Sequence, residues 1–135
     1  MSGAFLDSNV LVYAVLPADA RSVTAQGLLA AGGTISVQVL NEFAHVARRK
    51  LQRSWPEITQ ALTDIRLLCP PPLALTAATH GTALTLADRH GFSFYDALIV
   101  ASALEGRCTT LLTEDMQDGL VVAGRLTLHN PFKPG

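Results

Sequence analysis

Short apolar segments alternate along this chain with longer segments that have helical periodicity and capping residues. Strands are expected over residues 4–6, 34–36, 108–112, 120–122 and 126–128, with 73–75 as a possible further strand. A first helix is expected to begin at residue 8, and a polar break over 17–19 separates it from the next one. Further helices are expected over 20–31, 37–51, 55–68, 77–90 and 94–104. Strands separated by helices indicate a parallel sheet with helices on both faces. Ligands of such sheets bind beyond the carboxyl ends of the strands.

Composition narrows the class of protein further. The chain has 135 residues, 49% of them apolar and 16% charged, which predicts one compact domain over 1–135 rather than a disordered chain. The net charge of −1 excludes a basic field over the whole protein, so nucleic acid would have to bind at a local patch or through metal-bridged phosphates. The first residues do not resemble a signal peptide, and no apolar run approaches 18 residues, so we expect a cytoplasmic protein that does not span a membrane.

Four carboxylates stand in apolar surroundings near predicted strand ends or helix starts: Asp7, Glu42, Asp96 and Asp115. A buried carboxylate is costly unless a cation or hydrogen-bond donors compensate it. Two such groups about 5 Å apart repel by roughly 3 kcal/mol at an effective dielectric of 20. If the four meet in the fold, a bound divalent cation is the simplest remedy, and oxygen ligands suit Mg²⁺ or Mn²⁺.

Two of these acids also have an ordinary explanation as helix caps. Asp7 directly follows the strand over residues 4–6 and can cap the helix that begins at Ser8. Asp96 stands three residues after Ser93, which is the spacing of a capping box. Asp96 is, however, the only charged residue in the segment 95–104, where it shares a helix face with apolar side chains. Position alone leaves both explanations open.

The helix expected over 37–51 carries Glu42 together with a dense basic run. Glu42 has as its alternative explanation a salt bridge with His45 or Arg49. The basic residues form either a solvated helix face or a contact with an RNA backbone or a partner protein. This run consists of His45, Arg48, Arg49, Lys50 and Arg53, of which Arg48, Arg49 and Arg53 are the candidate RNA-binding residues.

Four segments together carry a family resemblance: FLDSNVL at 5–11, NEF at 41–43, FYDALIVASA at 94–103 and LTEDM at 112–116. They resemble PIN-domain nucleases, and the small size is similar to that of the toxin ribonucleases of bacterial and archaeal toxin–antitoxin pairs, the VapC group. The resemblance implies a three-layer α/β sandwich whose central, mostly parallel sheet has about four to five strands flanked by helices. It also implies cleavage of RNA with Mg²⁺ or Mn²⁺, a homodimer and a cognate antitoxin.

The resemblance assigns roles to individual residues. The acidic metal-site and catalytic positions fall on Asp7, Glu42, Asp96 and Asp115, and supporting polar positions fall on Asn9, Thr113 and Asp118. Glu114 is expected to face solvent. The implied reaction is in-line hydrolysis of an RNA phosphodiester, in which metal ions activate a water and neutralise charge at phosphorus.

Two functions of other classes remain open at this stage. The chain could be a catalytically silent interaction module with the same fold. It could also be a phosphotransfer domain with an aspartate acceptor, although such sites need a lysine near the phosphate. This chain has only Lys50 and Lys133, and neither follows a late strand closely.

Overall fold

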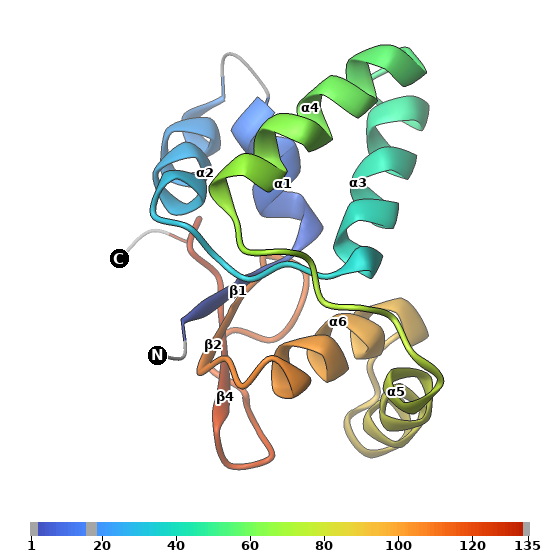
Figure 1. Ribbon diagram of the computed structural model, residues 1–135. Coiled ribbons are helices and arrows are strands. Elements are labelled where there is room, and N and C mark those ends of the chain that lie inside the picture. Colours follow the sequence, from blue (N-terminus) through green and yellow to red (C-terminus); the bar gives the residue numbers. More distant parts are fainter. Residues whose placement is uncertain (1–2, 16–18, 134–135) are drawn as a thin grey trace.

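The computed structural model describes residues 3–15 and 19–133, in which helices alternate with short strands (Figure 1). Residues 17 and 18 of the expected break lie outside these ranges. The strands are β1 (Ala4–Leu6), β2 (Thr110–Leu112), β3 (Val121–Val122) and β4 (Leu126–His129). The helices are α1 (Ser8–Val15), α2 (Ala20–Ala30), α3 (Val37–Arg49), α4 (Trp55–Leu68), α5 (Ala77–His90) and α6 (Phe94–Glu105).

The helix starts lie where side-chain caps satisfy the free backbone N–H groups of a first turn. Ser36 Oγ accepts the Val39 N–H, and Ser93 Oγ accepts the Asp96 N–H. Ser54 forms a reciprocal capping box with Glu57 at the start of α4. At its C-terminal end, α5 is capped by Gly91, which has φ 74°, a left-handed conformation that glycine adopts without steric cost.

The sheet has the order β1-β2-β4-β3 and is mostly parallel, which confirms the predicted class of fold. β1 pairs in parallel with β2, and β2 pairs in parallel with β4, while β3 runs antiparallel to β4. The expected strands at 34–36 and 73–75 are reduced to isolated parallel bridges, Phe5 with Thr34 and Ser36 with Leu73. They stay short because α3 begins at residue 37 and prolines occupy 70–72, where no N–H is available to extend a ladder.

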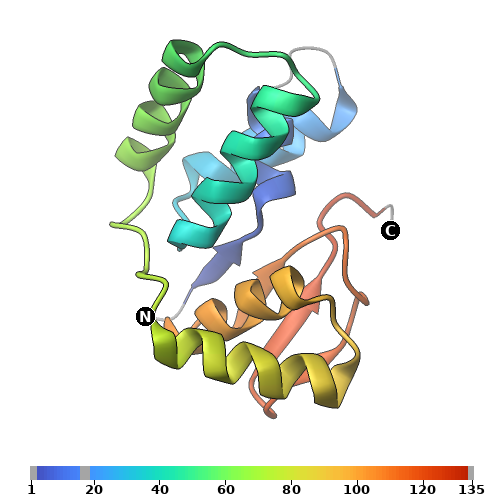
Figure 2. The ribbon, with the colours of Figure 1, turned by 90° about the vertical axis from the view of Figure 1, so that its right-hand side faces the viewer.

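The core lies between the sheet and two groups of helices. Helix α6 is apolar on all sides, and residues 97–104 are all buried, as expected for a central helix. Figures 1 and 2 both show α1 to α4 gathered around β1, whereas α5 and α6 lie together near β2. Within the described residues, none of the helices has the length and apolar character that crossing a membrane requires. The arrangement leaves the carboxyl ends of β1 and β2 next to the first turns of α1 and α6.

Candidate acidic active site

The parallel pairing of β1 and β2 brings two of the predicted acids to one edge of the sheet. Leu6 is in register with Leu112, so Asp7 and the segment that leads to Asp115 leave the sheet side by side. The Asp7 N–H donates to the Leu112 carbonyl at 3.1 Å, which extends the pairing by one step. Glu42 faces this edge from α3, and Asp96 belongs to the first turn of α6.

Asp7 is the most buried of the four carboxylates, with only 2% of its surface exposed. Its Oδ1 accepts the Ser8 N–H at 2.6 Å, and its Oδ2 accepts the Thr113 hydroxyl at 2.8 Å. Burial, followed by the negative charges of Glu42 and Asp115, raises the pKa of Asp7 to about 7. Its bond to Ser8 reaches the first residue of α1 rather than the second or third, so a capping role accounts for little of this environment.

Glu42 is half-buried and is held by two neutral donors. The Ser8 hydroxyl donates to its Oε1 at 3.0 Å, and the Gln38 side-chain amide donates to its Oε2 at 3.1 Å. The alternative explanation, a salt bridge with His45 or Arg49, is wrong, because no ion pair joins Glu42 to any described residue. Burial raises the pKa of Glu42, and the charges of Asp96 and Asp115 raise it further.

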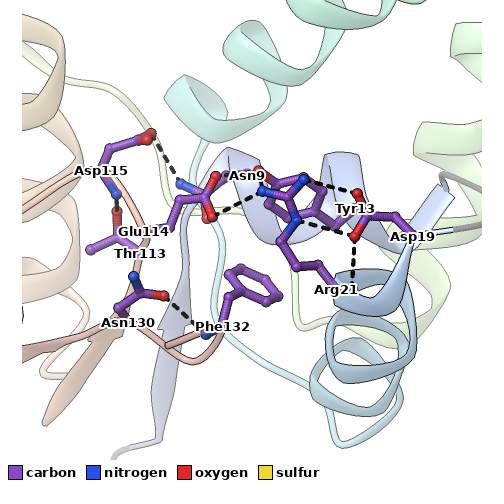
Figure 3. A network of polar contacts seen from close by, with 9 residues as sticks. All are labelled: Asn9, Tyr13, Asp19, Arg21, Thr113, Glu114, Asp115, Asn130 and Phe132. Atoms are coloured by element: carbon purple, nitrogen blue, oxygen red, sulfur yellow. Dashed lines mark hydrogen bonds and ion pairs between the residues drawn. The ribbon is translucent and has the colours of Figure 1, made fainter. Parts of the chain in front are cut away.

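Asp96 and Asp115 complete the acidic group from two further segments. Burial raises the pKa of Asp96, the Ser93 hydroxyl lowers it, and the charge of Asp115 raises it again. The Asp115 N–H donates to Thr113 Oγ1 at 3.2 Å, and the Asn9 amide donates to Asp115 Oδ2 at 3.1 Å. Figure 3 shows Asp115 bonded to both residues, with Thr113 below it and Asn9 to its right.

The acidic group suits a divalent cation by its chemistry. Its charged donors are all carboxylate oxygens, which hard cations such as Mg²⁺ and Mn²⁺ prefer. None of the four acids is paired with an arginine or lysine among the described residues. Asn9 Oδ1 is buried next to Asp115 and has no hydrogen-bond partner, so it is one more free oxygen at this edge.

The four acids are nevertheless not gathered tightly enough to form a ready-made cage. Across residues 3–15 and 19–133, no three acidic, histidine or cysteine side chains converge as a metal site requires. Their charges act on one another's pKa values, which is the interaction expected of neighbouring carboxylates that repel. A cation would have to draw these side chains together.

A cavity of about 630 Å³ opens beside the acids. Glu42 and Asp115 line it, together with residues that the sequence analysis did not single out. Ser8 and Gln38 were missed because a serine after a strand and a glutamine on a helix are common. Only their contacts with Glu42 reveal their role. The full lining consists of Ser8, Gln38, Asn41, Glu42, His45, Val46, Tyr95 and Asp115.

A second polar network lies beside Asp115 and connects three segments (Figure 3). Contrary to expectation, Glu114 does not face solvent: it accepts the Tyr13 hydroxyl and lies 3.7 Å from Arg21 Nη1. Arg21 also donates to the Tyr13 oxygen at 2.8 Å, and its guanidinium lies 4.2 Å from the centre of that ring. Burial, and then Glu114, raises the pKa of Tyr13 to about 12. The network fastens the loop after β2 to α1 and α2.

Asp118, predicted as a supporting residue, has partners in the C-terminal segment instead. One carboxylate oxygen accepts the Asn130 N–H at 2.8 Å and lies 3.4 Å from His129 Nδ1, and the other lies 3.7 Å from Lys133 Nζ. These partners lower the pKa of Asp118, with the Asn130 bond as the largest cause. The structure therefore does not bring Asp118 into the acidic group.

The candidate RNA-binding arginines fall outside the cavity lining. Arg48 donates to the Arg53 carbonyl at 3.1 Å and lies over the Trp55 ring at 5.0 Å, so it joins the end of α3 to the start of α4. Arg49 is exposed at the last turn of α3. A contact between these side chains and RNA stays a prediction.

Comparisons with known proteins agree with this geometry. The model of the PIN domain family matches residues 4–117. Mycobacterium tuberculosis VapC20, described as a Sarcin-Ricin loop cleaving toxin, has a similar solved structure with a TM-score of 0.64 and 23% identity, over 81% of this chain and 87% of that one. A toxin–antitoxin complex from Klebsiella pneumoniae has a TM-score of 0.73 and 17% identity, over 98% of this chain and 100% of that one. No curated protein sequence matches significantly. At these identities the two structures show a shared fold.

Proposed function

The chain belongs to the PIN domain family, and from that premise we propose that it is a divalent-metal-dependent endoribonuclease, the toxin of a toxin–antitoxin pair. The observation that carries the proposal is the group formed by Asp7, Glu42, Asp96 and Asp115. Four distant segments contribute these acids, each of the first three has its pKa raised, and no cation of the described protein compensates them. A structural role would favour paired or exposed carboxylates.

In this proposal, Asp7, Asp96 and Asp115 would hold Mg²⁺ or Mn²⁺ directly or through water. Such an ion would supply a water of lowered pKa and positive charge to offset that of the phosphate in an in-line hydrolysis. Glu42 lines the cavity, which supports a role for it in orienting the attacking water or in accepting its proton. Thr113 and Asn9 act as supports, because each donates a hydrogen bond to one of the acids.

Three further properties are part of the same proposal. The substrate is RNA, the protein acts as a homodimer in the cytoplasm, where RNA is found, and a cognate antitoxin covers it when it is inactive. The similar solved structures support the toxin assignment, since one is described as a toxin and the other as a toxin–antitoxin complex. Of the candidate arginines, Arg48 and Arg49 lie at the end of α3 and Arg53 lies between α3 and α4, where they would contact either RNA or the antitoxin.

Incubation with total RNA tests the proposal. Purified wild type, Asp7→Asn and Asp96→Asn are each incubated with RNA in the presence of Mn²⁺ or a chelator, and the new RNA ends are mapped. Asp88→Asn is the matched control, because Asp88 is exposed on α5 and does not line the cavity beside the acids. Discrete cuts made by wild type and Asp88→Asn only with metal are expected. Equal cutting by Asp7→Asn would refute the assignment.

One observation favours a second candidate, a catalytically silent interaction module. Such a module would have no need of a metal cage, and within the described residues no three potential ligands converge. Thermal melts with and without Mn²⁺ separate the two functions. A nuclease should melt at a higher temperature with Mn²⁺, because a ligand that binds only the native state stabilises it. An unchanged wild-type melt, together with no effect of Asp96→Asn, would favour the silent module.

A further inference from the structure

The cavity beside the acids has a wall on which the proposed chemistry uses Glu42 alone. Gln38, Asn41, Glu42 and His45 follow one another at the spacing that places side chains on one face of a helix, here α3. Glu42 is the acidic member of this face, and the other three contribute two amides and an imidazole. Tyr95, in the first turn of α6, lines the same cavity.

The chemistry of this wall differs from that of a phosphate site. The eight lining residues include two carboxylates but neither lysine nor arginine. Proteins bind the RNA backbone mainly through such cations, so this wall has little to offer a phosphate. It offers amide groups, an imidazole and a phenol ring, which can form hydrogen bonds with the edge of a nucleobase and stack on its face. The wall therefore suits the uncharged part of a nucleotide.

Tyr95 is the most informative residue of the wall. Its side chain is 64% exposed, although burying an aromatic ring would stabilise the fold. Its ring meets Phe94 edge-on, with the centroids 5.9 Å apart. It lines the same cavity as Glu42 and Asp115, so a base stacked on it would lie beside these two acids. Exposed aromatic rings are the surfaces on which single-stranded nucleic acid stacks its bases.

We propose that Tyr95 stacks against an unpaired RNA base adjacent to the phosphate that is cut, and that Asn41 and His45 contact the edge of this base. The inference rests on the proposed ribonuclease function and adds a base subsite to it. The cavity volume of about 630 Å³ lies within the ~300–1,000 Å³ range of small-ligand sites, so one nucleotide fits. The subsite selects unpaired RNA, because a base within a helix has no free face.

The test compares the cleavage of two single-stranded RNA oligonucleotides around one mapped cut. The first is the intact sequence, and in the second the bases flanking the cut are replaced by abasic ribose. Wild type, Tyr95→Ala and Tyr95→Phe are measured for kcat and KM on both. Leu67→Ala removes a side chain that is 80% exposed on α4, outside the cavity, and serves as the control for loss of surface apolar area. Thermal melts verify that each variant is folded.

On the intact RNA, Tyr95→Ala should lower kcat/KM by about 5- to 150-fold, mainly through KM, since base stacking has that range of effect. Tyr95→Phe and Leu67→Ala should resemble wild type. On the abasic RNA, wild type should fall to the level of Tyr95→Ala. Equal activity of Tyr95→Ala and wild type on intact RNA, or an equal loss on both RNAs, would overturn the base subsite alone. Wild type that cuts no RNA would overturn the proposed function and this inference together.

Discussion

The pKa of Asp7 makes the metal-free protein sensitive to pH in a way that one substitution should remove. Asp7 is nearly fully buried, and its pKa rises from the usual 3.8 to about 7. Replacing it by asparagine removes the ionisable group and preserves its shape. The asparagine oxygen can accept the Ser8 N–H, and its amide can donate to the Thr113 hydroxyl, which rotates to accept it. The hydrogen bonds therefore survive in Asp7→Asn.

The sign and size of this effect of pH on the free energy of unfolding follow from the linkage between protonation and folding. Because the native state holds the Asp7 proton more tightly than the unfolded chain does, ionisation of Asp7 destabilises the fold as the pH rises from about 4 to about 7. The penalty is absent below the pKa of the unfolded chain and is complete above the native pKa. At ~1.4 kcal/mol per pKa unit it approaches about 4 kcal/mol, and about 3 kcal/mol of it develops between about pH 4.5 and about pH 8.

Urea denaturation followed by circular dichroism in a chelator measures this difference. The free energy of unfolding of wild type should fall relative to that of Asp7→Asn by about 3 kcal/mol between the two pH values. Taking the difference between the two proteins cancels the titration of the other acids as long as they are unaffected. Parallel pH profiles for wild type and Asp7→Asn would show that burial of this carboxylate has been misjudged. Excess Mn²⁺ should reverse the order of the two stabilities at pH 8 and make wild type the more stable protein, because the ion would bind the ionised Asp7 of the native state.

Three further outcomes test single contacts. Gly33→Ala should destabilise the fold by about 1–3 kcal/mol in urea denaturation, because its Cβ would lie 2.6 Å from Leu6 Cγ, and an unchanged stability would contradict the packing. Ser54→Ala should cost about 0.5–2 kcal/mol by removing a helix cap, while leaving RNA cleavage intact. Ser8→Ala removes the hydroxyl that donates to Glu42 and should lower kcat with little effect on thermal stability, and a normal kcat would show that Glu42 needs no such support.

The positions of the helices and main strands could be predicted because their signals are local. Ser36, Ser54 and Ser93 are caps that act within a few residues, and each begins a helix where expected. The bridges at 34–36 and 73–75 were overestimated as strands. Whether a short apolar segment forms a strand depends on the strand it pairs with and on how close the next helix begins. The residues of the segment alone determine neither of these.

Some features of the candidate site could likewise be predicted from the sequence, and others could not. Asp7 and Asp115 could be placed together because both follow strands, and parallel strands end at the same edge. The ties of Glu114 to Tyr13 and Arg21, and of Asp118 to the C-terminal segment, could not be foreseen. Such contacts join residues far apart in sequence, and a charged residue in a loop gives no sign of which distant partner it will meet.

The pairing of β1 with β2 also decides when the acidic group comes into existence. Thr113 contacts Asp7 across 106 positions, so the site cannot assemble until the chain as far as β2 is available. A nascent chain in which β2 is still inside the exit tunnel of the ribosome carries Asp7 and Glu42 but lacks the strand that positions Thr113 and Asp115. The acidic group is therefore a late product of folding, whereas the helices that contribute Glu42 and Asp96 depend on local signals.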